Sequence, residues 1–551
     1  MYGPLRFFYR LGTTVTIGGI CNEGGIAGLK EIFGTYSITN PFQIIAPETK
    51  LIVNWSSNIS ENNNHTSYLI KEKIRKGTHL IVIDTRKIPI AEHSDLFLQP
   101  NPYSDYLLSK VILLKLLQKN AIDINFLKKN VEGYDYVLKE ISLTNLSKYL
   151  ALIGIKEHYI DEFVDELIRF KHHTIFNIGY GLQKHKYGGR IVQIVSLIQI
   201  ILGNIGKSGT GIIYSQSGFN KPITNPLISF ITQNLKLSKS KEIELITLGS
   251  QLVKEKYKIL FIYNCNPASS LPNQNQLRKA LIREDLYVVV IDLFLNETTR
   301  YADIVIPAKF DLEASDFISS YCIPGISIIQ GGPCPYEQCR SNYEFFRDLA
   351  FRLNIKNNGI FKLDHQQIFE KGIELLPNEI RRTLKQKGYY LLQENNSIPF
   401  NNLQFPTSNK KIQIGFLNFD FEKEIIDNLK KTSKNEFFLI TPSNKYFLHS
   451  QLGELHSEKL DAFNNIYIHL DDLERLGLEE NEKVLVKNKK HSSSYFIKSD
   501  TSLKKGVVCI HSGPSSFLTE TNANHFTPAT PEILGYSGSY NSAKVKIEKI
   551  E

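Results

Sequence analysis

Two stretches of the chain show the same order of apolar and polar segments. In the first, an apolar run at 51–55 (LIVNW) is followed by the polar triplet SSN, a helix-like stretch and a second apolar run (HLIVI) that ends at Asp84. In the second, the order is KILFIYN, CNP, a helix-like stretch (NQLRKALIRE) and YVVVI, which ends at Asp292. Continuous Val, Ile and Leu runs separated by helices are typical of a parallel sheet that is buried on both faces.

The spacing inside these two stretches also agrees. Asn58 precedes Asp84 by 26 residues, and Asn266 precedes Asp292 by 26 residues. In each stretch a further aspartate follows 11 residues later. The agreement predicts duplicated β-α-β units.

The ends of the predicted strands carry polar side chains. Ligands of parallel sheets bind beyond the carboxyl ends of the strands, where an acid can accept hydrogen bonds from ribose hydroxyls. Loop amides at the start of a following helix can hold a phosphate. The repeat therefore fits two nucleotide-like sites in one chain. It fits equally a duplicated scaffold whose aspartates only cap helices, and the repeat alone leaves both interpretations open.

The remaining segments predict further elements. A helical region is expected at 104–171, and a glycine-rich loop (GYGLQKHKYGG) leads to a helix at 191–202. Residues 354–435 are polar and are expected to form a variable connection. From about residue 437 the pattern changes to short strands such as FFLIT, KVLVKN and GVVCIHS, which predict a compact β-barrel.

Composition narrows the class of protein only a little. A chain of 551 residues is too long for one core, so two to four domains are expected, and 42% hydrophobic with 22% charged residues is ordinary for a globular protein. The net charge of +9 suits anionic ligands, although a Lys-rich composition produces it without any partner. No basic stripe interleaved with aromatic residues appears in the sequence, so we expect no nucleic-acid partner.

Cysteine usage and the apolar runs bear on the compartment. Six sparse cysteines without a CxxC pair argue against a disulfide framework and against an iron–sulfur cluster or zinc site encoded in this chain. The first residues lack the apolar core of a signal peptide, and the run at 191–202 is too short to span a bilayer. We expect a cytoplasmic chain with no direct membrane span, unless an export signal belonged to a missing N-terminal part.

Several motifs follow one another along the chain in a characteristic order: ICNEGGIAGL, NWSSN, VIDTRK, GYGLQKHKYGG, ILGNIGKSGTG, YNCNPASSLPNQ, DLFLNETTRYADIVIPA and the tail NHFTPATPEILGYSGSYNSAKVKIEKI. In this order they resemble the motifs of molybdopterin oxidoreductases of the dimethyl-sulfoxide-reductase and formate-dehydrogenase type. The resemblance implies an α/β fold with two related parallel-sheet nucleotide-binding domains and a C-terminal β-barrel of the double-psi type. The expected division is a remnant of the first cofactor domain at 1–45, an α/β nucleotide-binding domain at 46–170, a second α/β cofactor domain at 171–430 and the barrel at 431–551.

The resemblance also implies a cofactor and its binding residues. In this family two guanine-nucleotide pterins, together called bis-molybdopterin guanine dinucleotide, wrap around one molybdenum or tungsten. One nucleotide arm would contact Trp55, Ser57, Asn58, Asp84, Arg86, Pro102 and Asp105. The other arm would contact Asn264, Asn266, Pro267, Asp292, Thr298 and Asp303. The pterins would be approached by Gly179, Gly181 and Gln183, and the barrel would close over the cofactor with Asn524 and Tyr540.

Cys21 falls where the family places the protein ligand to the metal, which makes it the expected catalytic residue. It precedes a glycine-rich turn entering a helix, and a helix N-terminus favours the thiolate. Thiolates suit a soft metal environment. A single cysteine is otherwise most often a small buried hydrophobe, and the alignment favours the ligand. The other cysteines are interpreted as structural or surface thiols: Cys265, Cys322, Cys334, Cys339 and Cys509.

The chain departs from the family pattern at three places. The family normally begins with a segment that often holds an iron–sulfur cluster on four cysteines, and this chain is expected to lack that segment. Formate dehydrogenases carry a histidine after the metal-binding residue and an arginine in the helix before the GN-G motif, where this chain has Asn22 and Gln193. The first repeat reads SSNI where the family often has GSNP. The second departure weakens a formate-oxidising assignment.

The resemblance implies an oxidoreductase catalytic subunit that transfers an oxygen atom, a sulfur atom or a hydride equivalent to or from an unknown small substrate. An iron–sulfur subunit is the expected electron-transfer partner. The alternative is a non-catalytic electron-transfer scaffold or an inactive truncated relative, similar to the large peripheral subunit of NADH dehydrogenase. A plain nicotinamide dehydrogenase is excluded because no GxGxxG follows a strand in either repeat.

Overall fold

The computed structural model describes residues 3–232, 240–319, 323–355, 359–392, 397–430, 433, 435–451, 453, 455–513 and 521–550. The chain divides into two compact units. The smaller unit comprises Met1–Ile17, Gln216–Ser269 and Gln274–Glu394. The larger unit comprises Gly18–Ser215, Ser270–Asn273 and Asn395–Glu551. Each unit contains one of the two predicted β-α-β repeats.

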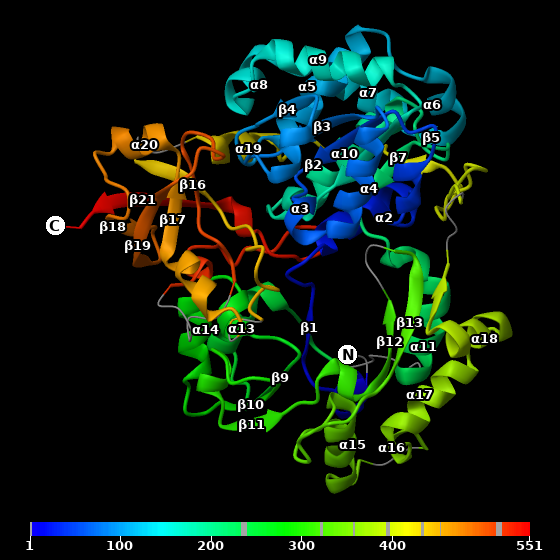
Figure 1. Ribbon diagram of the computed structural model, residues 1–551, viewed down its shortest axis with the longest axis vertical. Coiled ribbons are helices and arrows are strands. Elements are labelled where there is room, and N and C mark those ends of the chain that lie inside the picture. Colours follow the sequence, from blue (N-terminus) through cyan, green and yellow to red (C-terminus); the bar gives the residue numbers. More distant parts are fainter. Residues whose placement is uncertain are drawn as a thin grey trace. The chain divides into compact units, whose positions relative to one another are not determined.

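The first repeat forms part of a parallel sheet in the larger unit, with the strand order β4-β3-β2-β6-β7 (Figure 1). Every residue of β2 and of β6 is buried, as expected for a sheet covered on both faces. The strands are β2 (Leu51–Trp55), β3 (His79–Ile83), β4 (Leu96–Leu98), β6 (Thr174–Ile178) and β7 (Gly211–Ile213). Strands β6 and β7 lie after residue 170, where a domain boundary was expected, and they belong to the same sheet. The domain boundaries remain a prediction.

Helices pack on this sheet and its connections. Between β2 and β3 lie α3 (Ile59–Asn62) and α4 (Asn64–Arg75). The helical region expected at 104–171 is confirmed as α5 (Asp105–Gln118), α6 (Ile124–Asn130), α7 (Tyr134–Ser142), α8 (Leu146–Ile153) and α9 (Glu157–Arg169). The helix expected at 191–202 is α10 (Gly188–Ile201), and every residue in it except Arg190 is buried.

Helix α2 (Glu23–Phe33) packs closely against α10 because both helices present glycine at the contact. A Cβ atom on Gly28 would lie 2.6 Å from Gly189 O, and one on Gly189 would lie 2.5 Å from Gly24 O. These distances are too short for any side chain. The contact fixes the N-terminus of α2, where Cys21 lies, relative to the loop that precedes α10.

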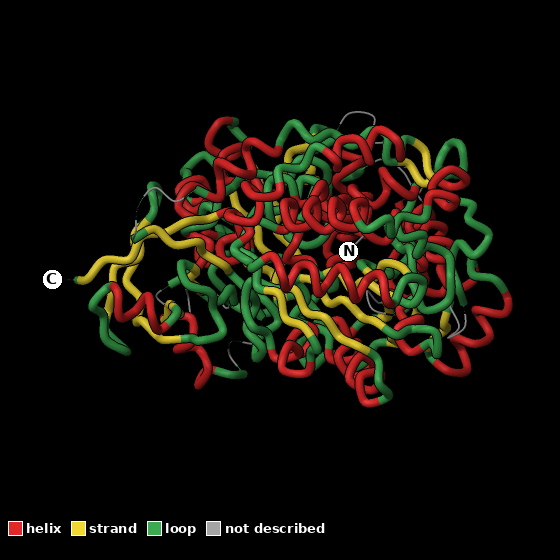
Figure 2. Tube along the Cα trace, turned by 90° about the horizontal axis from the view of Figure 1, so that it is seen from above, coloured by secondary structure: helices red, strands yellow, loops and turns green. Residues whose placement is uncertain are grey.

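The C-terminal part of the larger unit is a closed barrel with the strand order β16-β20-β17-β19-β18-β21, as predicted. The pairs β16–β20 and β17–β19 are parallel and the other four are antiparallel, and β21 runs to the C-terminus (Figure 2). Apolar side chains such as Phe437, Ile466 and Val484 fill its interior. The elements are β16 (Glu436–Ile440), β17 (Asn465–Ile468), α20 (Leu470–Arg475), β18 (Lys483–Lys487), β19 (Ser492–Ser499), β20 (Val507–Cys509) and β21 (Ala543–Lys549).

The second repeat forms the parallel sheet β11-β10-β9 of the smaller unit. Its elements are β9 (Ile259–Tyr263), α13 (Pro267–Ser270), α14 (Gln274–Leu281), β10 (Tyr287–Asp292) and β11 (Ile304–Pro307). The same unit contains the antiparallel sheet of β12 (Ser315–Ser319), β13 (Gly325–Gln330) and β14 (Tyr389–Leu391), and the parallel pair of β1 (Val15–Ile17) and β8 (Glu242–Glu244). Its other helices include α1 (Gly3–Leu11), α11 (Lys221–Thr232), α12 (Leu248–Lys254) and α15 (Asn342–Arg352).

The stretch 354–435 is more regular than the expected variable connection. It holds α16 (Gly359–Lys362), α17 (His365–Glu374), α18 (Asn378–Lys387), β14, β15 (Ile412–Gln413) and α19 (Glu422–Leu429), and β15 pairs with β5 (Val131–Glu132). A capping box of Asp364 and Gln367 starts α17. The expectation of a mere connection was wrong because the polar surface of these amphipathic helices dominates the composition.

An aspartate joins neighbouring strands at the amino-terminal edge of both parallel sheets. Directly before β4, Asp95 accepts a hydrogen bond from Leu80 N of β3 at 2.7 Å, and Asp95 N donates to Leu80 O at 2.8 Å. Directly before β11, Asp303 makes the same pair with Val288 of β10, at 2.7 and 2.8 Å. The 11-residue spacing in the sequence therefore marks one strand-to-strand contact that occurs in both repeats.

Replacing either aspartate should lower the stability of its unit. We expect Asp95→Ala or Asp303→Ala to reduce the free energy of unfolding by about 1–3 kcal/mol, because a buried main-chain N–H loses its acceptor. The measurement is the denaturant midpoint followed by circular dichroism. Asp311→Ala, at an exposed position in the same unit as Asp303, is the matched control and should leave the midpoint unchanged. Unchanged midpoints in all three variants would contradict this role.

Candidate functional site

The carboxyl edge of the large-unit sheet collects the predicted residues of the first nucleotide arm. Each follows directly after a strand or begins the next helix, and the parallel register brings these strand ends to one edge. Trp55 ends β2, and Ser57 and Asn58 follow it; Asp84 and Arg86 follow β3; Pro102 and Asp105 follow β4; Gly179 and Gly181 follow β6.

Two carboxylates at this edge are strongly affected by burial. The side chain of Asp105 is 3% exposed, and its Oδ1 accepts a hydrogen bond from Trp55 Nε1 at 2.8 Å. Burial raises the pKa of Asp105 to about 6, although the hydrogen bond from Trp55 lowers this pKa. Burial also raises the pKa of Asp84 to about 6; the Arg86 N–H bond and the Arg86 charge oppose the shift, and Asp105 adds to it. The edge therefore holds acids that need additional donors to ionise easily.

Asn58 and Ser57 are held by neighbouring polar groups. Asn58 Nδ2 donates to Glu61 Oε2 at 2.7 Å, and within the described residues no donor reaches the buried Asn58 Oδ1. Asn54 Nδ2 donates to Ser57 O at 2.7 Å, and Asn177 Nδ2 donates to Asn54 Oδ1 at 2.7 Å. The Asn54–Asn177 pair joins β2 to β6, and motif comparison did not single it out. An unused buried acceptor at a strand end is suited to a ligand with N–H or O–H groups.

The two glycines after β6 lie against the loop that follows β2. A Cβ atom on Gly179 would lie 1.9 Å from Ser56 O, and one on Gly181 would lie 3.1 Å from the same atom. Gly179 is therefore required by the contact between the two loops, in addition to any approach of a ligand.

Cys21 lies directly before the N-terminus of α2 and is half-buried. Gln183 bridges two backbone groups there: its Nε2 donates to Cys21 O, and its Oε1 accepts from Gly25 N at 2.9 Å. Lys184 Nζ donates to Ile20 O. The loop GYGLQKHKYGG therefore positions the cysteine through its backbone.

The protonation of Cys21 differs from the expectation for a helix N-terminus. Burial raises the pKa of the thiol, the Lys184 charge lowers it, and Glu23 raises it. The neutral thiol is thus favoured in the free protein. Binding a metal through sulfur would release the proton, because the thiolate is the ligand.

The smaller unit brings most residues of the second predicted arm to the carboxyl edge of its own sheet. Asn264, Asn266 and Pro267 follow β9, Asp292 ends β10, and Thr298 lies in the next loop. Thr298 Oγ1 donates to Asn266 Oδ1 at 2.6 Å and accepts from Ala268 N at 3.0 Å. Asp292 accepts from Leu293 N at 2.7 Å and from Asn296 Nδ2 at 2.9 Å.

Asp303 does not lie at this edge. Because it precedes β11 and bonds to Val288, it lies at the amino-terminal edge, four residues of β10 away from Asp292. At roughly 3.3 Å per residue this separation is about 13 Å. The structure places its carboxylate in the strand-joining contact described above, apart from the other predicted residues of this arm.

Asn524 and Tyr540 extend from the barrel segment toward one carbonyl group of the larger unit. Asn524 Nδ2 donates to Ser270 O at 3.2 Å, and Tyr540 OH donates to the same oxygen at 2.9 Å. Lys184 Nζ lies 5.1 Å from the centre of the Tyr540 ring. These contacts link the barrel to the loop beside Cys21.

Sequence reasoning missed two buried polar residues. Glu532 is fully buried and accepts hydrogen bonds from Gly189 N at 3.0 Å, Leu534 N at 2.9 Å and Gly535 N at 2.6 Å. It therefore holds the C-terminal tail against the start of α10. Gln216, after β7, is 2% exposed, and within the described residues its amide has no hydrogen-bond partner. Neither residue has a periodic or spacing signal in the sequence.

Comparison with known proteins decides the family. Residues 14–352 match the family described as molybdopterin oxidoreductase, and residues 437–544 match the molybdopterin dinucleotide binding domain.

The chain belongs to the molybdopterin oxidoreductase family. It is 27% identical to the probable oxidoreductase YoaE of Bacillus subtilis over 99% of this chain and 81% of that protein. It is 24% identical to a formate dehydrogenase alpha subunit of Methanocaldococcus jannaschii over 96% of this chain and 81% of that protein. Acetylene hydratase from Pelobacter acetylenicus has the same fold, with a TM-score of 0.75 and 16% identity over 100% of this chain and 84% of that chain.

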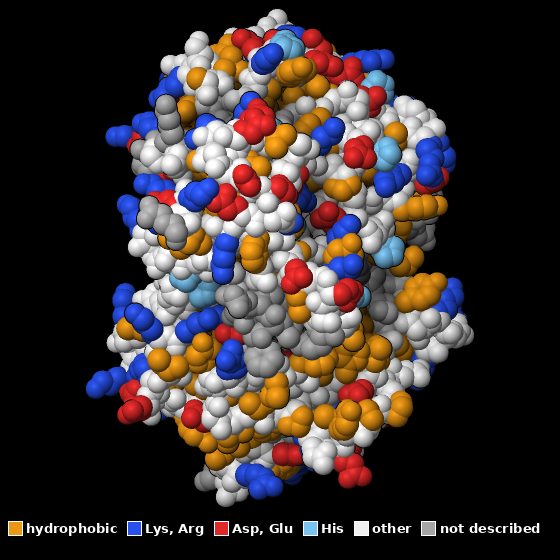
Figure 3. Space-filling view, turned by 60° about the vertical axis from the view of Figure 1, so that its left-hand side comes forward, with side chains coloured by type: hydrophobic (Ala, Val, Ile, Leu, Met, Phe, Trp, Pro, Cys, Tyr) orange, Lys and Arg blue, Asp and Glu red, His pale blue; other side chains and the backbone are white. Residues whose placement is uncertain are grey.

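These findings confirm the predicted family, fold class and enzyme class. The dinucleotide binding domain coincides with the barrel, so a molybdopterin cofactor is indicated for this molybdopterin oxidoreductase. Within the described residues, every helix is too short or too polar to cross a membrane. On the face shown in Figure 3, lysine and arginine side chains are interspersed with acidic ones.

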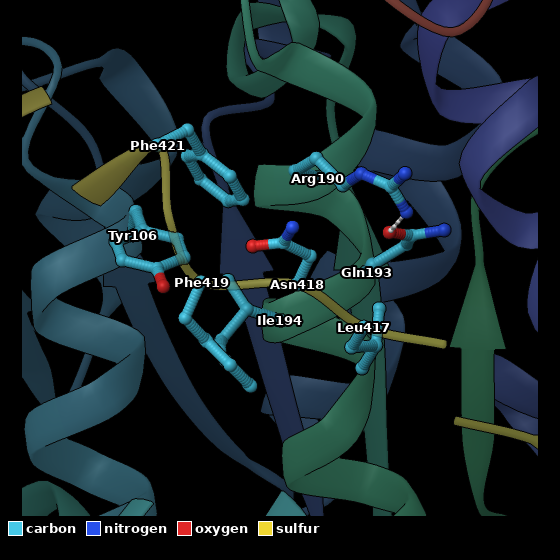
Figure 4. Close-up of a pocket in the computed structure, with 8 residues that line it drawn as sticks. All are labelled: Tyr106, Arg190, Gln193, Ile194, Leu417, Asn418, Phe419 and Phe421. Carbon is cyan, nitrogen blue, oxygen red and sulfur yellow. Dashed lines mark hydrogen bonds between the residues drawn. The ribbon is translucent and has the colours of Figure 1, made fainter. Parts of the chain in front are cut away.

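Gln193, where formate dehydrogenases would carry arginine, is a packing residue in this oxidoreductase. Its Nε2 donates to Gly28 O at 2.9 Å and to Glu31 Oε2 at 2.8 Å, and Arg190 Nη1 donates to its Oε1 at 2.9 Å (Figure 4). The adjoining cavity, which Tyr106 and Phe421 also line, has a volume of about 10 Å³. That space is about what one water molecule needs.

The raised pKa of Asp105 predicts a pH-dependent stability of the cofactor-free protein. In the folded protein Asp105 has a pKa of about 6, above the ordinary 3.8. Protonated Asp105 therefore contributes its full stability to the fold below about pH 4, and this contribution is lost as the pH rises through 6. Asp105→Asn keeps an acceptor for Trp55 and should be more stable than the wild type at pH 7 by up to about 3 kcal/mol, with no gain at pH 4.

Denaturant midpoints at pH 4 and 7 measure this difference. Asp135→Asn, at an exposed position of the same unit, is the control. Identical pH dependence in Asp105→Asn and the wild type would show that Asp105 ionises normally.

Proposed function

We propose that this chain is the catalytic subunit of an oxidoreductase that holds bis-molybdopterin guanine dinucleotide with molybdenum or tungsten. The observation that carries the proposal is the desolvated acid at the carboxyl edge of the large-unit sheet: Asp105 is 3% exposed and has a pKa of about 6. A carboxylate in that setting accepts two N–H donors from a guanine edge with high selectivity. The Asn266, Asp292 and Thr298 set supplies a second arm in the smaller unit.

Each of the predicted residues would contact a different part of the cofactor or the metal. Asp105 would hold guanine, Asp84 and Asn58 would accept hydrogen bonds from the sugar and its neighbours, and Cys21 would bind the metal through sulfur. Gln183 and Lys184 would keep the cysteine backbone in place through the bonds to Cys21 O and Ile20 O. The cofactor supplies the two-electron oxo, sulfur or hydride transfer, and the protein orients and desolvates it.

We also propose a class of substrate and an electron-transfer partner. The substrate is a small molecule of unassigned identity, and an iron–sulfur subunit accepts or donates the electrons because we propose that no cluster is encoded in this chain. We place the protein in the cytoplasm, without a nucleic-acid partner. Since the loss of the formate-type arginine leaves Gln193 in a packing contact, formate is the least favoured substrate.

The two nucleotide arms can be tested separately. Asp105→Ala should weaken one guanine contact by about 1.5–3 kcal/mol, which is roughly 10- to 100-fold in affinity, and Asp292→Ala should weaken the other arm. The purified variants should release less GMP than the wild type on acid hydrolysis, measured by chromatography. Asp135→Ala should release the wild-type amount. Unchanged GMP in both site variants would exclude these aspartates as nucleotide ligands.

The metal ligand can be tested by its spectrum. In Cys21→Ala we expect the metal to lose one protein sulfur neighbour in X-ray absorption, with the nucleotide content retained and turnover of an artificial electron donor lost. Cys21→Ser should replace that sulfur with a lighter neighbour. If both variants kept the wild-type sulfur coordination, Cys21 would not be a ligand.

A further inference from the structure

The loop between β13 and α15 in the smaller unit carries two cysteines, Cys334 and Cys339, which are separated by four intervening residues. Both are partly exposed, and both donate to the same carbonyl group, Cys334 through its thiol and Cys339 through its backbone N–H. Cys334 Sγ donates to Tyr336 O at 3.4 Å, and Cys339 N donates to Tyr336 O at 3.1 Å. The turn at Tyr336 therefore folds the two cysteines toward each other.

The Cys334 thiol is one of the groups that affect the pKa of Cys339. Partial burial raises the pKa of Cys339, and so does the Cys334 thiol, which hydrogen-bonds to it; Glu313 raises it further and Lys309 lowers it. Because Cys334 Sγ and Cys339 N lie 3.4 and 3.1 Å from the same oxygen, Tyr336 O, a small rearrangement of the two side chains can bring the sulfurs to bonding distance. None of these groups belongs to the cofactor arms described above.

The end of the loop is anchored. Arg340 N donates to Pro307 O at 3.1 Å, and Lys309 N donates to Arg340 O at 3.0 Å. The Arg340 side chain returns to the loop, where its Nη1 donates to Glu337 O at 2.6 Å and to Cys339 O at 2.9 Å. Cys339 is thus held in place, and only the 334–338 segment has to adjust for the sulfurs to meet.

The loop adjoins a cavity of about 350 Å³ in the same unit. Lys309 and Glu313, whose charges act on Cys339, both line this cavity, and Lys309 pairs with Glu344 at 2.9 Å. Closing the loop would therefore stiffen a segment next to a solvent-filled space large enough to admit a small molecule.

We propose that Cys334 and Cys339 are a redox-active dithiol that closes to an intramolecular disulfide by exchange with a small-molecule disulfide such as oxidised glutathione. One cysteine thiolate attacks a sulfur of the oxidant, which forms a mixed disulfide and releases one glutathione thiolate. The second cysteine attacks the protein sulfur of that mixed disulfide and releases the other glutathione. Two electrons pass from the protein to the oxidant, and the two cysteine protons end on the two glutathione thiols.

The test uses the full chain, as purified, with Cys322→Ser as background because Cys322, which lies outside the described residues, shares a tryptic peptide with the pair. The protein is equilibrated at increasing ratios of oxidised to reduced glutathione, alkylated, and cleaved with trypsin and after Glu337. Mass spectrometry should find the Cys334 and Cys339 peptides joined, with a fraction that rises with the ratio and returns to zero with dithiothreitol.

Two single variants keep the result interpretable. In Cys334→Ser, Cys339 has no partner, so it should accumulate a glutathione adduct that the pair itself resolves. Cys265→Ser, a control for another exposed thiol, should retain the joined peptides. If both cysteines were alkylated at every ratio, or if each carried glutathione without a joined product, the proposal would be overturned.

Discussion

Parallel pairing of β2 with β3 and β6 is the constraint on which the candidate site depends. Trp55 is in register with Ile83 and with Ile178, so the residues that follow the three strands emerge at one edge. Both faces of this sheet are covered, so a ligand can reach its strands at their ends. The same arrangement in the smaller unit places Asp292 and the Asn266–Thr298 pair at the end of its own sheet. Duplication of one strand pattern thereby produces two separate sets of nucleotide-compatible residues.

Close packing at glycine carries this constraint to the predicted metal ligand. The α2–α10 contact leaves no space for a Cβ atom on Gly28 or Gly189, and it brings the start of α2 beside the loop that contains Gln183. That arrangement leaves the Cys21 thiol half-buried, with a raised pKa. Desolvation is therefore shared by the cysteine and the nucleotide-edge acids. The charged form of each of these groups becomes more favourable when a bound ligand supplies the polar contacts that burial from water has removed.

Much of this arrangement could be predicted from the sequence, because continuous apolar runs and equal spacings report strands directly. The barrel, the repeats and the strand-end positions of Asp84 and Asp292 follow from such local patterns. Asp303 was assigned to the second arm from the family resemblance alone, and that assignment stays a prediction; its position directly before an apolar run shows that it precedes a strand. Glu532 bonds to Gly189, 343 residues away in the chain, and no local pattern contains such a contact.

The most direct test of the account is the metal and nucleotide content of the wild-type chain purified from its native source. We expect molybdenum or tungsten near one per chain and about two GMP released on acid hydrolysis, because we propose one nucleotide arm in each unit. A properly folded chain with neither metal nor GMP would contradict the account and would leave a scaffold that retains the fold of its family without the cofactor.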